Sequence, residues 1–373
     1  MPSICFVSNS AWSLYNFRID IIRHFLSKGC TVLVMAAEDE YAALLQQEGC
    51  RFVPVHFNNR TENPFTDYAL YRHLKKLYKI YRPDIVFHYV IKPNIYGSLA
   101  AAAQQIPSIA VITGLGYAFS RRNWRYFLIK VLYTQALKKT REVWFLNNED
   151  AQFFMAQHMV AVEKTRVLHG EGINTGYFLP AARPPQNEKF RFLMSTRLLK
   201  SKGVAIYADA ARILKKKNYQ VDFELIGFYE QHHPDSIRQE EIDRWQQEGL
   251  IHYSGFARDV RSFLSAADCF VFPSFYSEGV PRCLMEAASM QLPVITSDNR
   301  GCKEVVTDNI TGYLCNMNNP FDLADKMEKI MQLSGDERAA MGARGRQLVL
   351  EKFNIRRIID VYDQVLPQPA PGS

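Results

Sequence analysis

Short apolar segments alternate with amphipathic ones along most of this chain, and no other feature of the sequence restricts its fold as strongly. We expect strands at residues 3–9, 30–37, 51–57, 84–90, 108–114 and 142–147, with helices between them, such as residues 14–29 and 64–83. Strands that alternate with helices form right-handed βαβ units. The pattern therefore predicts an α/β fold with a parallel sheet covered by helices.

The segment FLPAARPPQNEK, residues 178–189, interrupts this alternation with three prolines and no apolar period, which is typical of a linker. The alternation then restarts, with strands expected at 190–196, 221–227, 250–255, 269–274, 293–298 and 312–315. We therefore predict a first domain at 1–180, a linker at 181–189, a second domain at 190–350, and a closing helix and tail at 351–373. The last helical segment, near 336–366, is long enough to return to the first domain. Ligands of two such domains bind at the carboxyl ends of the strands, in a cleft between them.

The net charge of +7 lies within residues 1–180, where 20 Lys and Arg face 13 Asp and Glu. This imbalance indicates an anionic partner for the first domain, or simply a few solvated basic helix faces. No stretch approaches the roughly 18 uninterrupted apolar residues of a membrane-spanning helix, and the N-terminus does not resemble a secretory signal. The seven scattered cysteines lack metal-binding spacing, so we expect reduced cytosolic thiols.

The first candidate site is STRLLKSKG, residues 195–203, at the end of the second domain's first strand. Arg197 and Lys202 flank a loop that ends at Gly203, and a helix begins there. Two cations beside a helix N-terminus are typical of a diphosphate site. The alternative is two surface cations in a polar turn.

Two further strands of the second domain end in glycine. LIG ends at Gly227 and YSG ends just before Phe256. A glycine at a strand end lets a ligand approach the backbone. Phe256 either meets a nucleobase or simply fills the edge of the domain.

The stretch FVFPSFYSEGVPRCLMEA, residues 270–287, carries Glu278 in a loop and Glu286 in the helix that follows. The N–H groups of residues Gly279, Val280, Pro281 and Arg282 are expected at the positive end of that helix. Buried carboxylates need polar partners, so the pair indicates sugar or ribose hydroxyls. A capping Glu and a solvent-facing Glu are the alternative.

Together these motifs resemble family 4 of the retaining glycosyltransferases, which have the GT-B fold. The resemblance rests on Arg197 and Lys202, on the E-x7-E spacing of SEGVPRCLMEA, and on the glycine loop in TSDNRGCKEVV. It extends to EGINTGYFLP, IPSIAVITGLGYAF, SLYNFR and KPNIYGSLAA, and covers nearly the whole chain. Within the family, the chain is most similar to bacterial enzymes that add N-acetylhexosamines to undecaprenyl-diphosphate-linked sugars.

This resemblance implies two Rossmann-like domains facing a central cleft, with the C-terminal helix crossing back to the first domain. It implies that Arg197 and Lys202 bind the donor diphosphate, that Glu278 contacts the transferred sugar, and that Glu286 binds the ribose. The loop Ser8–Ser13 would close over the diphosphate, with Ser13 at its end. N–H groups of residues 279–282 would meet the sugar and phosphate.

The sequence departs from the family where many members carry a histidine. Thr113 stands there, followed by Gly114. His88, at the end of strand 84–90, is either a replacement or a histidine of the core. No D-x-D motif lies near the predicted cleft, so we expect no metal and no cofactor beyond the nucleotide-sugar donor.

The resemblance therefore implies transfer of a sugar from a UDP-sugar, such as UDP-N-acetylhexosamine, to a lipid-linked saccharide in bacterial glycan biosynthesis. The basic, aromatic segment 120–139, with Arg121 and Arg122, is expected to lie on an anionic membrane surface at the inner face of the cell membrane, unless its apolar face is core. We expect no nucleic-acid partner. A nucleotide-sugar epimerase and a non-catalytic nucleotide-sugar-binding protein remain alternatives, whereas the lack of G-x-G-x-x-G disfavours a dehydrogenase.

Overall fold

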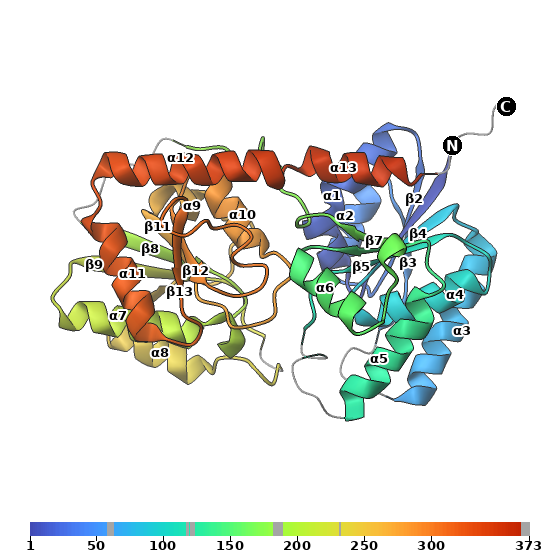
Figure 1. Cartoon of the computed structure of the whole chain (residues 1–373), viewed down its shortest axis with the longest axis horizontal. Helices are drawn as coiled ribbons and strands as arrows, with labels where there is room; N and C mark the ends of the chain where they lie inside the picture. Colours follow the sequence, from blue (N-terminus) through green and yellow to red (C-terminus); the bar gives the residue numbers. More distant parts are fainter. Residues whose placement is uncertain (58–62, 117–118, 120–123, 182–188, 231–232, 367–373) are drawn as a thin grey trace. The chain divides into compact units, whose positions relative to one another are not determined.

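The computed structural model describes residues 1–57, 63–116, 119, 124–181, 189–230 and 233–366. The chain divides into two compact units. The first comprises Met1–Gly172 and Ile355–Ser373, and the second comprises Ile173–Asn354. A parallel sheet with helices on both faces forms the centre of each unit (Figure 1). This agrees with the predicted α/β class.

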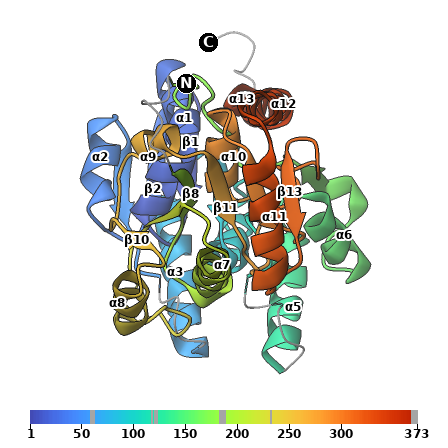
Figure 2. The same cartoon turned by 90° about the vertical axis from the view of Figure 1, so that its left-hand side faces the viewer.

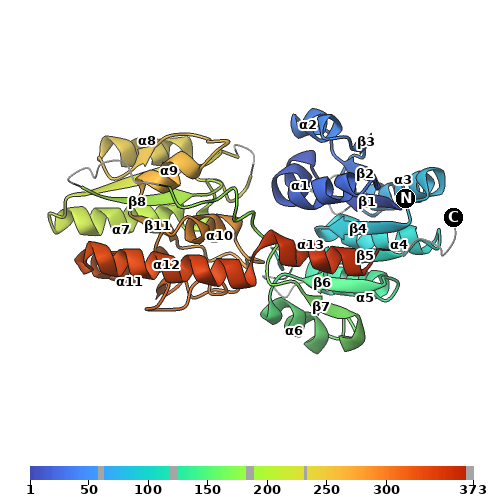
Figure 3. The same ribbon diagram turned by 90° about the horizontal axis from the view of Figure 1, so that it is seen from above.

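The sheet of the first unit has the strand order β3-β2-β1-β4-β5-β6-β7, which can be followed from above in Figure 3. Its strands are β1 Ser3–Val7, β2 Thr31–Ala36, β3 Arg51–Pro54, β4 Ile85–Tyr89, β5 Ser108–Ile112, β6 Glu142–Phe145 and β7 Thr165–Val167. All the strand pairs are parallel. The order reverses between β1 and β4, the point at which such sheets bind ligands.

Helices cover both faces of this sheet, so the inner strands are apolar throughout. One face carries α1 Ala11–Ser27, α2 Tyr41–Gln47 and α13 Ile355–Gln364, and the other carries α3 Pro64–Tyr81, α4 Ser98–Ala102 and α5 Trp124–Leu137 (Figure 1). The short helix η1 Pro93–Gly97 contacts α3, α4 and α5. The remaining elements are α6 Asn148–Ala156 and η3 Val162–Lys164. The core therefore lies on both sides of the sheet.

Helix α13 belongs to the first unit although it follows the second unit in the sequence, as predicted. The ring of Tyr362 lies 4.7 Å from that of Phe87 and 4.8 Å from that of Trp144, measured between centroids. Its hydroxyl lies 2.7 Å from the hydroxyl of Tyr89. Because these partners are buried strand residues, burial of aromatic surface holds the helix on the sheet.

His88 occupies the core of the first unit. It is fully buried in β4, and its ring nitrogens lie 2.8 Å from the hydroxyl of Tyr78 and 3.2 Å from that of Ser98. Burial lowers its pKa to about 3, so the ring is neutral at physiological pH. We therefore correct its assignment as a substrate-binding residue, because both ring nitrogens are engaged inside the protein.

The second unit repeats the same plan, with the strand order β10-β9-β8-β11-β12-β13. Its strands are β8 Phe190–Ser195, β9 Val221–Ile226, β10 His252–Tyr253, β11 Cys269–Phe272, β12 Val294–Ser297 and β13 Gly312–Cys315. Its helices are η4 Lys200–Lys202, α7 Val204–Lys216, α8 Gln239–Gln247, α9 Arg261–Ala266, α10 Arg282–Ser289, α11 Pro320–Gln332 and α12 Gly335–Lys352. Figure 2 shows α7 and α8 below the sheet and α9, α10 and α12 above it. The strand order reverses between β8 and β11.

The unit boundaries differ from the predicted ones. Residues 173–180 group with the second unit because Ser289 Oγ donates to the carbonyl of Phe178 at 2.7 Å, and the Ile173 N–H donates to the carbonyl of Phe353 at 2.8 Å. The helical segment near 336–366 is two helices, since α12 ends at Lys352 and α13 begins at Ile355. The centre of the predicted linker, residues 182–188, lies outside the described residues.

Candidate active site

The loops that follow β8 and β11 meet where the strand order of the second unit reverses. Arg197 and Lys202 follow β8, and Glu278 follows β11, its neighbour in the sheet. Ligands bind at such switch points in parallel sheets. Residues far apart in the sequence are thereby brought to one edge, which is the candidate active site.

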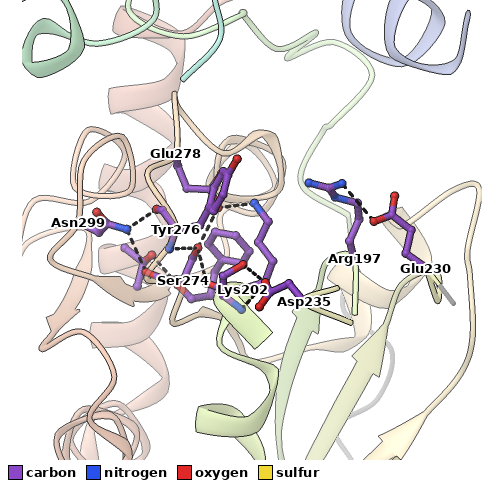
Figure 4. Close-up of polar contacts among 11 residues, drawn as sticks. Arg197, Lys202, Glu230, Asp235, Ser274, Tyr276, Glu278 and Asn299 are labelled. Atoms are coloured by element: carbon purple, nitrogen blue, oxygen red, sulfur yellow. Dashed lines mark hydrogen bonds and ion pairs between the residues drawn. The ribbon is translucent and has the colours of Figure 1, made fainter. Parts of the chain in front are cut away.

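Lys202 and Glu278 form an ion pair at this edge, between Lys202 Nζ and Glu278 Oε1. The two residues are 8% and 9% exposed, so the pair is largely withdrawn from water. Ser274 Oγ donates to the same carboxylate oxygen at 2.8 Å, and Lys202 Nζ lies 4.8 Å from the centroid of the Tyr276 ring. Figure 4 shows these side chains converging. A lysine and a glutamate held this way present fixed charges of both signs to a ligand.

The loop that carries Lys202 is fixed from the opposite side by Asp235. The carboxylate of Asp235 accepts a hydrogen bond from the Ser201 N–H at 3.0 Å and another from the Ser201 hydroxyl. The Ser201 carbonyl in turn accepts from the Phe275 N–H at 2.9 Å. The loops after β8, β9 and β11 are therefore tied together by hydrogen bonds around one residue, so the position of Lys202 is strongly constrained.

Asn299, after β12, holds the loop of Glu278 in place. Its side-chain nitrogen donates to the carbonyls of Ser274 at 3.2 Å and of Tyr276 at 2.5 Å. It is 8% exposed. The loops after β8, β9, β11 and β12 thus all contribute to the site, and Figure 4 shows their labelled side chains.

Gly227 lies where two loops of the site touch. A Cβ at this position would stand 1.6 Å from the carbonyl oxygen of Thr196, and the backbone has φ of +150°. The Gly227 N–H donates to the carbonyl of Gly255 at 2.9 Å. Only glycine lets the end of β9 approach the segment that leads into Arg197.

Arg197 is more accessible than Lys202. Its Nη1 lies 3.5 Å from Glu230 Oε2, and the two side chains are 37% and 34% exposed. Such a half-exposed pair is weak. Arg197 therefore lies in the candidate site near Lys202, and its guanidinium could leave Glu230 to bind an anionic ligand.

Glu286 is placed differently from Glu278. It lies on α10, where Arg282 Nε donates to its Oε1 at 2.8 Å, one turn earlier in the same helix. The two predicted site residues thus pair with each other. Gly279, Val280 and Pro281 precede the helix and are buried. Since proline has no N–H, the predicted run of backbone donors is interrupted at Pro281.

Phe256 is half-exposed at the end of β10, with its ring centroid 6.1 Å from that of Phe228. Both rings lie in loops at the carboxyl edge of the sheet. Phe256 therefore packs against Phe228 at the edge of the domain and keeps about half of its surface exposed, an arrangement that fits both predicted roles.

Thiols near the site are poor nucleophile candidates. Burial raises the pKa of the Cys283 thiol well above its usual value, and it raises the pKa of Cys302 as well. In the part of the chain that the structure describes, no group of three or more His, Cys, Asp or Glu side chains is arranged to hold a metal ion.

In the first unit, the predicted residues lie at the ends of neighbouring elements. Thr113 and Gly114 follow β5 and are partly exposed. Ser13 lies in the first turn of α1, not in a loop, because Ser10 caps the helix and accepts from the Ser13 N–H at 3.2 Å. Its hydroxyl is 2.6 Å from that of Ser8, at the end of β1. These side chains neighbour the switch point of the first sheet.

Sequence reasoning missed Ser201, Asp235, Ser274 and Asn299. None has a distinctive spacing from Lys202 or Glu278. The one available signal was the polar Ser274 directly after the apolar run FVFP, at a predicted strand end.

Comparisons with known proteins match almost the whole chain. The family described as "Glycosyl transferase 4-like" matches residues 3–147, and "Glycosyl transferases group 1" matches residues 179–348. The N,N'-diacetylbacillosaminyl-diphospho-undecaprenol alpha-1,3-N-acetylgalactosaminyltransferase of Campylobacter jejuni is 27% identical over 97% of this chain and 99% of its own length. The UDP-Gal:alpha-D-GlcNAc-diphosphoundecaprenol alpha-1,3-galactosyltransferase of Escherichia coli is 27% identical over 77% of this chain and 76% of its own length.

Solved structures share the fold. A glycosyltransferase from Rickettsia africae superposes with a TM-score of 0.82 at 20% identity, covering 98% of this chain and 97% of that one. HepE from Anabaena, in complex with UDP-glucose, superposes with a TM-score of 0.81 at 18% identity, covering 98% and 100%.

Proposed function

The chain belongs to family 4 of the glycosyltransferases and has the GT-B fold, and on that premise we propose that it transfers a sugar, with retention, from a UDP-sugar to an undecaprenyl-diphosphate-linked saccharide. The observation that carries this proposal is the buried Lys202–Glu278 pair at the switch point of the second unit, with Arg197 beside it. The relatives named above act on diphospho-undecaprenol saccharides, which supports the acceptor class.

The charges of this pair suit the transition state of glycosyl transfer. As the bond to the leaving group breaks, positive charge develops on the sugar ring and negative charge on the nucleoside diphosphate. Glu278 beside the sugar and Lys202 beside the diphosphate form a fixed dipole that matches this separation. Arg197 adds a second cation for the diphosphate. Both charges are set before the reaction, so little reorganisation is needed.

Retention requires the acceptor to attack on the face that the leaving group vacates. We assign the acceptor's proton to an oxygen of the departing phosphate, which lies on that same face, so no protein nucleophile is needed. Consistent with this, the nearby thiols of Cys283 and Cys302 are held protonated by burial. We propose that Glu286 binds the ribose hydroxyls of the donor and gives up its hydrogen bond to Arg282 to do so. We also propose that the first unit binds the acceptor. The donor sugar that we propose is an N-acetylhexosamine.

Thermal unfolding with a panel of UDP- and GDP-sugars tests the donor assignment. A UDP-sugar at 100 times its Kd should stabilise the protein by about 2.7 kcal/mol, and GDP-sugars should not. The selected donor is then incubated with an undecaprenyl-diphosphate-linked monosaccharide, and the lengthened lipid is measured. Product from the donor alone, with an epimerised sugar, would identify an epimerase. Binding without any product would identify a nucleotide-sugar-binding protein.

A second part of the proposal is attachment to an anionic membrane at the inner face of the cell membrane, through the first unit. We assign this attachment to exposed apolar side chains on two helices of this unit, Phe65 of α3 and Trp124, Phe127 and Val131 of α5, whose exposed fractions are 86%, 65%, 59% and 56%. Tyr133 and Leu137 of the same helix α5 are buried, so the core does not use these outer side chains. Exposed basic residues on these two helices and shortly after them include Arg72, Lys76, Lys79, Arg82, Lys138, Lys139 and Arg141.

Exposed aromatic side chains with basic neighbours are typical of helices that lie at a lipid surface. Among the described helices, none combines the length and hydropathy needed to cross a bilayer. Arg121 and Arg122, also predicted to contact the membrane, lie outside the described residues.

Replacing Trp124 and Phe127 with serine should weaken sedimentation with anionic vesicles about tenfold or more, since burying one such side chain contributes about 1.5–3 kcal/mol. Wild-type binding should also fall as salt rises. Phe321→Ser, which removes a 74% exposed aromatic ring from the second unit, is the matched control and should bind as wild type does. Equal binding by all three proteins, or binding indifferent to salt and to anionic lipid, would rule out this docking mode.

A further inference from the structure

Ser274 is a fully buried side chain that touches the proposed sugar-binding carboxylate. We propose that it is a positioning residue for sugar transfer: its hydroxyl holds one oxygen of Glu278 so that the other oxygen faces the transferred sugar. The inference rests on the proposed function, because Ser274 acts only through Glu278. At 0% exposure it is withdrawn from any ligand in the site.

The proton of the hydroxyl has two acceptors within reach. Ser274 Oγ lies 2.8 Å from Glu278 Oε1 and 3.2 Å from the carbonyl oxygen of Ser201. A hydroxyl carries one proton, and an ionised carboxylate at the shorter distance is the stronger acceptor. The Ser201 carbonyl already accepts from the Phe275 N–H at 2.9 Å. The proton of Ser274 therefore lies toward Glu278.

Glu278 Oε1 then receives two donors, Lys202 Nζ and Ser274 Oγ. A carboxylate oxygen has two lone-pair directions, and these donors occupy both. A sugar hydroxyl that binds Glu278 is thereby directed to Oε2. With Lys202 as its one partner, the carboxylate of Glu278 could still rotate about that contact. A second donor on the same oxygen, the Ser274 hydroxyl, restricts this rotation and so fixes the plane of the carboxylate.

The same hydroxyl shapes the loop between Ser274 and Glu278. Ser274 Oγ accepts a hydrogen bond from the Tyr276 N–H at 3.3 Å, and the Glu278 N–H donates to the Tyr276 carbonyl at 2.9 Å. Side-chain bonds of this local type are typical of serine in turns. One side chain thus places both the backbone and the carboxylate of Glu278 (Figure 4).

The variant Ser274→Ala tests this role in steady-state transfer assays. We expect kcat to fall by about 10- to 100-fold, as small misplacements of a reacting group do, while binding of UDP measured by calorimetry stays as in wild type, because UDP lacks the sugar. Ser274→Thr keeps the hydroxyl and should recover most of kcat. In a Glu278→Gln background, adding Ser274→Ala should cause no further loss.

Ser289→Ala is the matched control. Ser289 is also fully buried, and its hydroxyl donates to the Phe178 carbonyl at 2.7 Å. It is the last residue of α10 and does not contact Glu278, so this variant reports only the stability that is lost with a buried hydroxyl. A normal kcat in Ser274→Ala, or an equal loss in Ser289→Ala, would overturn the inference. If the wild-type protein transfers no sugar, the proposed function itself is wrong, and this outcome is distinct from either.

Discussion

Replacing Lys202 with methionine is expected to reduce kcat for sugar transfer by about 100- to 1,000-fold, the usual result of removing one preorganised charge from a transition state. The reason is that Lys202 is the buried cation of the site, at 8% exposure, and is held by Glu278. Steady-state assays with the donor selected above measure the loss. Wild-type kcat in this variant would contradict the site assignment.

The same substitution is also expected to destabilise the second unit, which the sequence did not predict. Breaking a buried ion pair leaves an uncompensated charge and costs about 3–5 kcal/mol. The double variant Lys202→Met with Glu278→Gln removes both charges and should regain most of this stability, but not the transfer activity. Denaturant unfolding of the three proteins separates the two effects.

Arg197→Ala serves as the comparison. Because Arg197 is 37% exposed and its pairing with Glu230 is loose, this variant should lose transfer activity with little change in unfolding free energy. We therefore expect both variants to lose transfer activity, whereas only the Lys202 variant should lose a large part of its unfolding free energy.

Gly227→Ala is expected to destabilise the second unit by more than about 4 kcal/mol, because steric strain of this kind gives the largest mutational effects. The added Cβ would lie 1.6 Å from the carbonyl oxygen of Thr196, so the loop before Arg197 must move. UDP binding should weaken together with stability. Thermal unfolding and calorimetry with UDP measure the two losses.

Gly255→Ala is the matched control for this substitution. Gly255 also has a left-handed backbone, with φ of +75°, but a Cβ added there would meet no atom within 4 Å. Its substitution should cost only about 1–2 kcal/mol of backbone strain. Similar losses in the two variants would show that the clash with Thr196 is not the cause.

The general plan of the fold could be predicted from hydrophobic periodicity, because buried parallel strands appear in a sequence as short apolar runs and the helices between them as amphipathic segments. The edge at which such sheets bind ligands follows from that plan, so Arg197, Lys202 and Glu278 were predicted to lie at one site. The pairing of Lys202 with Glu278 was not predicted. It depends on β8 and β11 being neighbours in the sheet, which the order of segments along the chain does not reveal.

Local errors have equally specific causes. Ser10 caps α1 and draws Ser13 into the helix, whereas the prediction started the helix from its apolar period alone. Arg282 and Glu286, four residues apart, are at the spacing that favours a helical ion pair, and this alternative to ribose binding was visible in the sequence. The sequence left His88 as either a replacement for the missing histidine or a residue of the core, and its burial confirms the core alternative. The sequence did not predict its partners, because Tyr78 and Ser98 come from separate helices.

The return of α13 to the first unit has a consequence for synthesis on the ribosome. Tyr362 covers the rings of Phe87 and Trp144, yet it is translated only after the whole of the second unit, residues 173–354. At about 5–20 residues per second, this takes roughly 10–40 s. During that interval the rings of Phe87 and Trp144 lack the cover of Tyr362, so the packing of the first unit is completed only after α13 has been made.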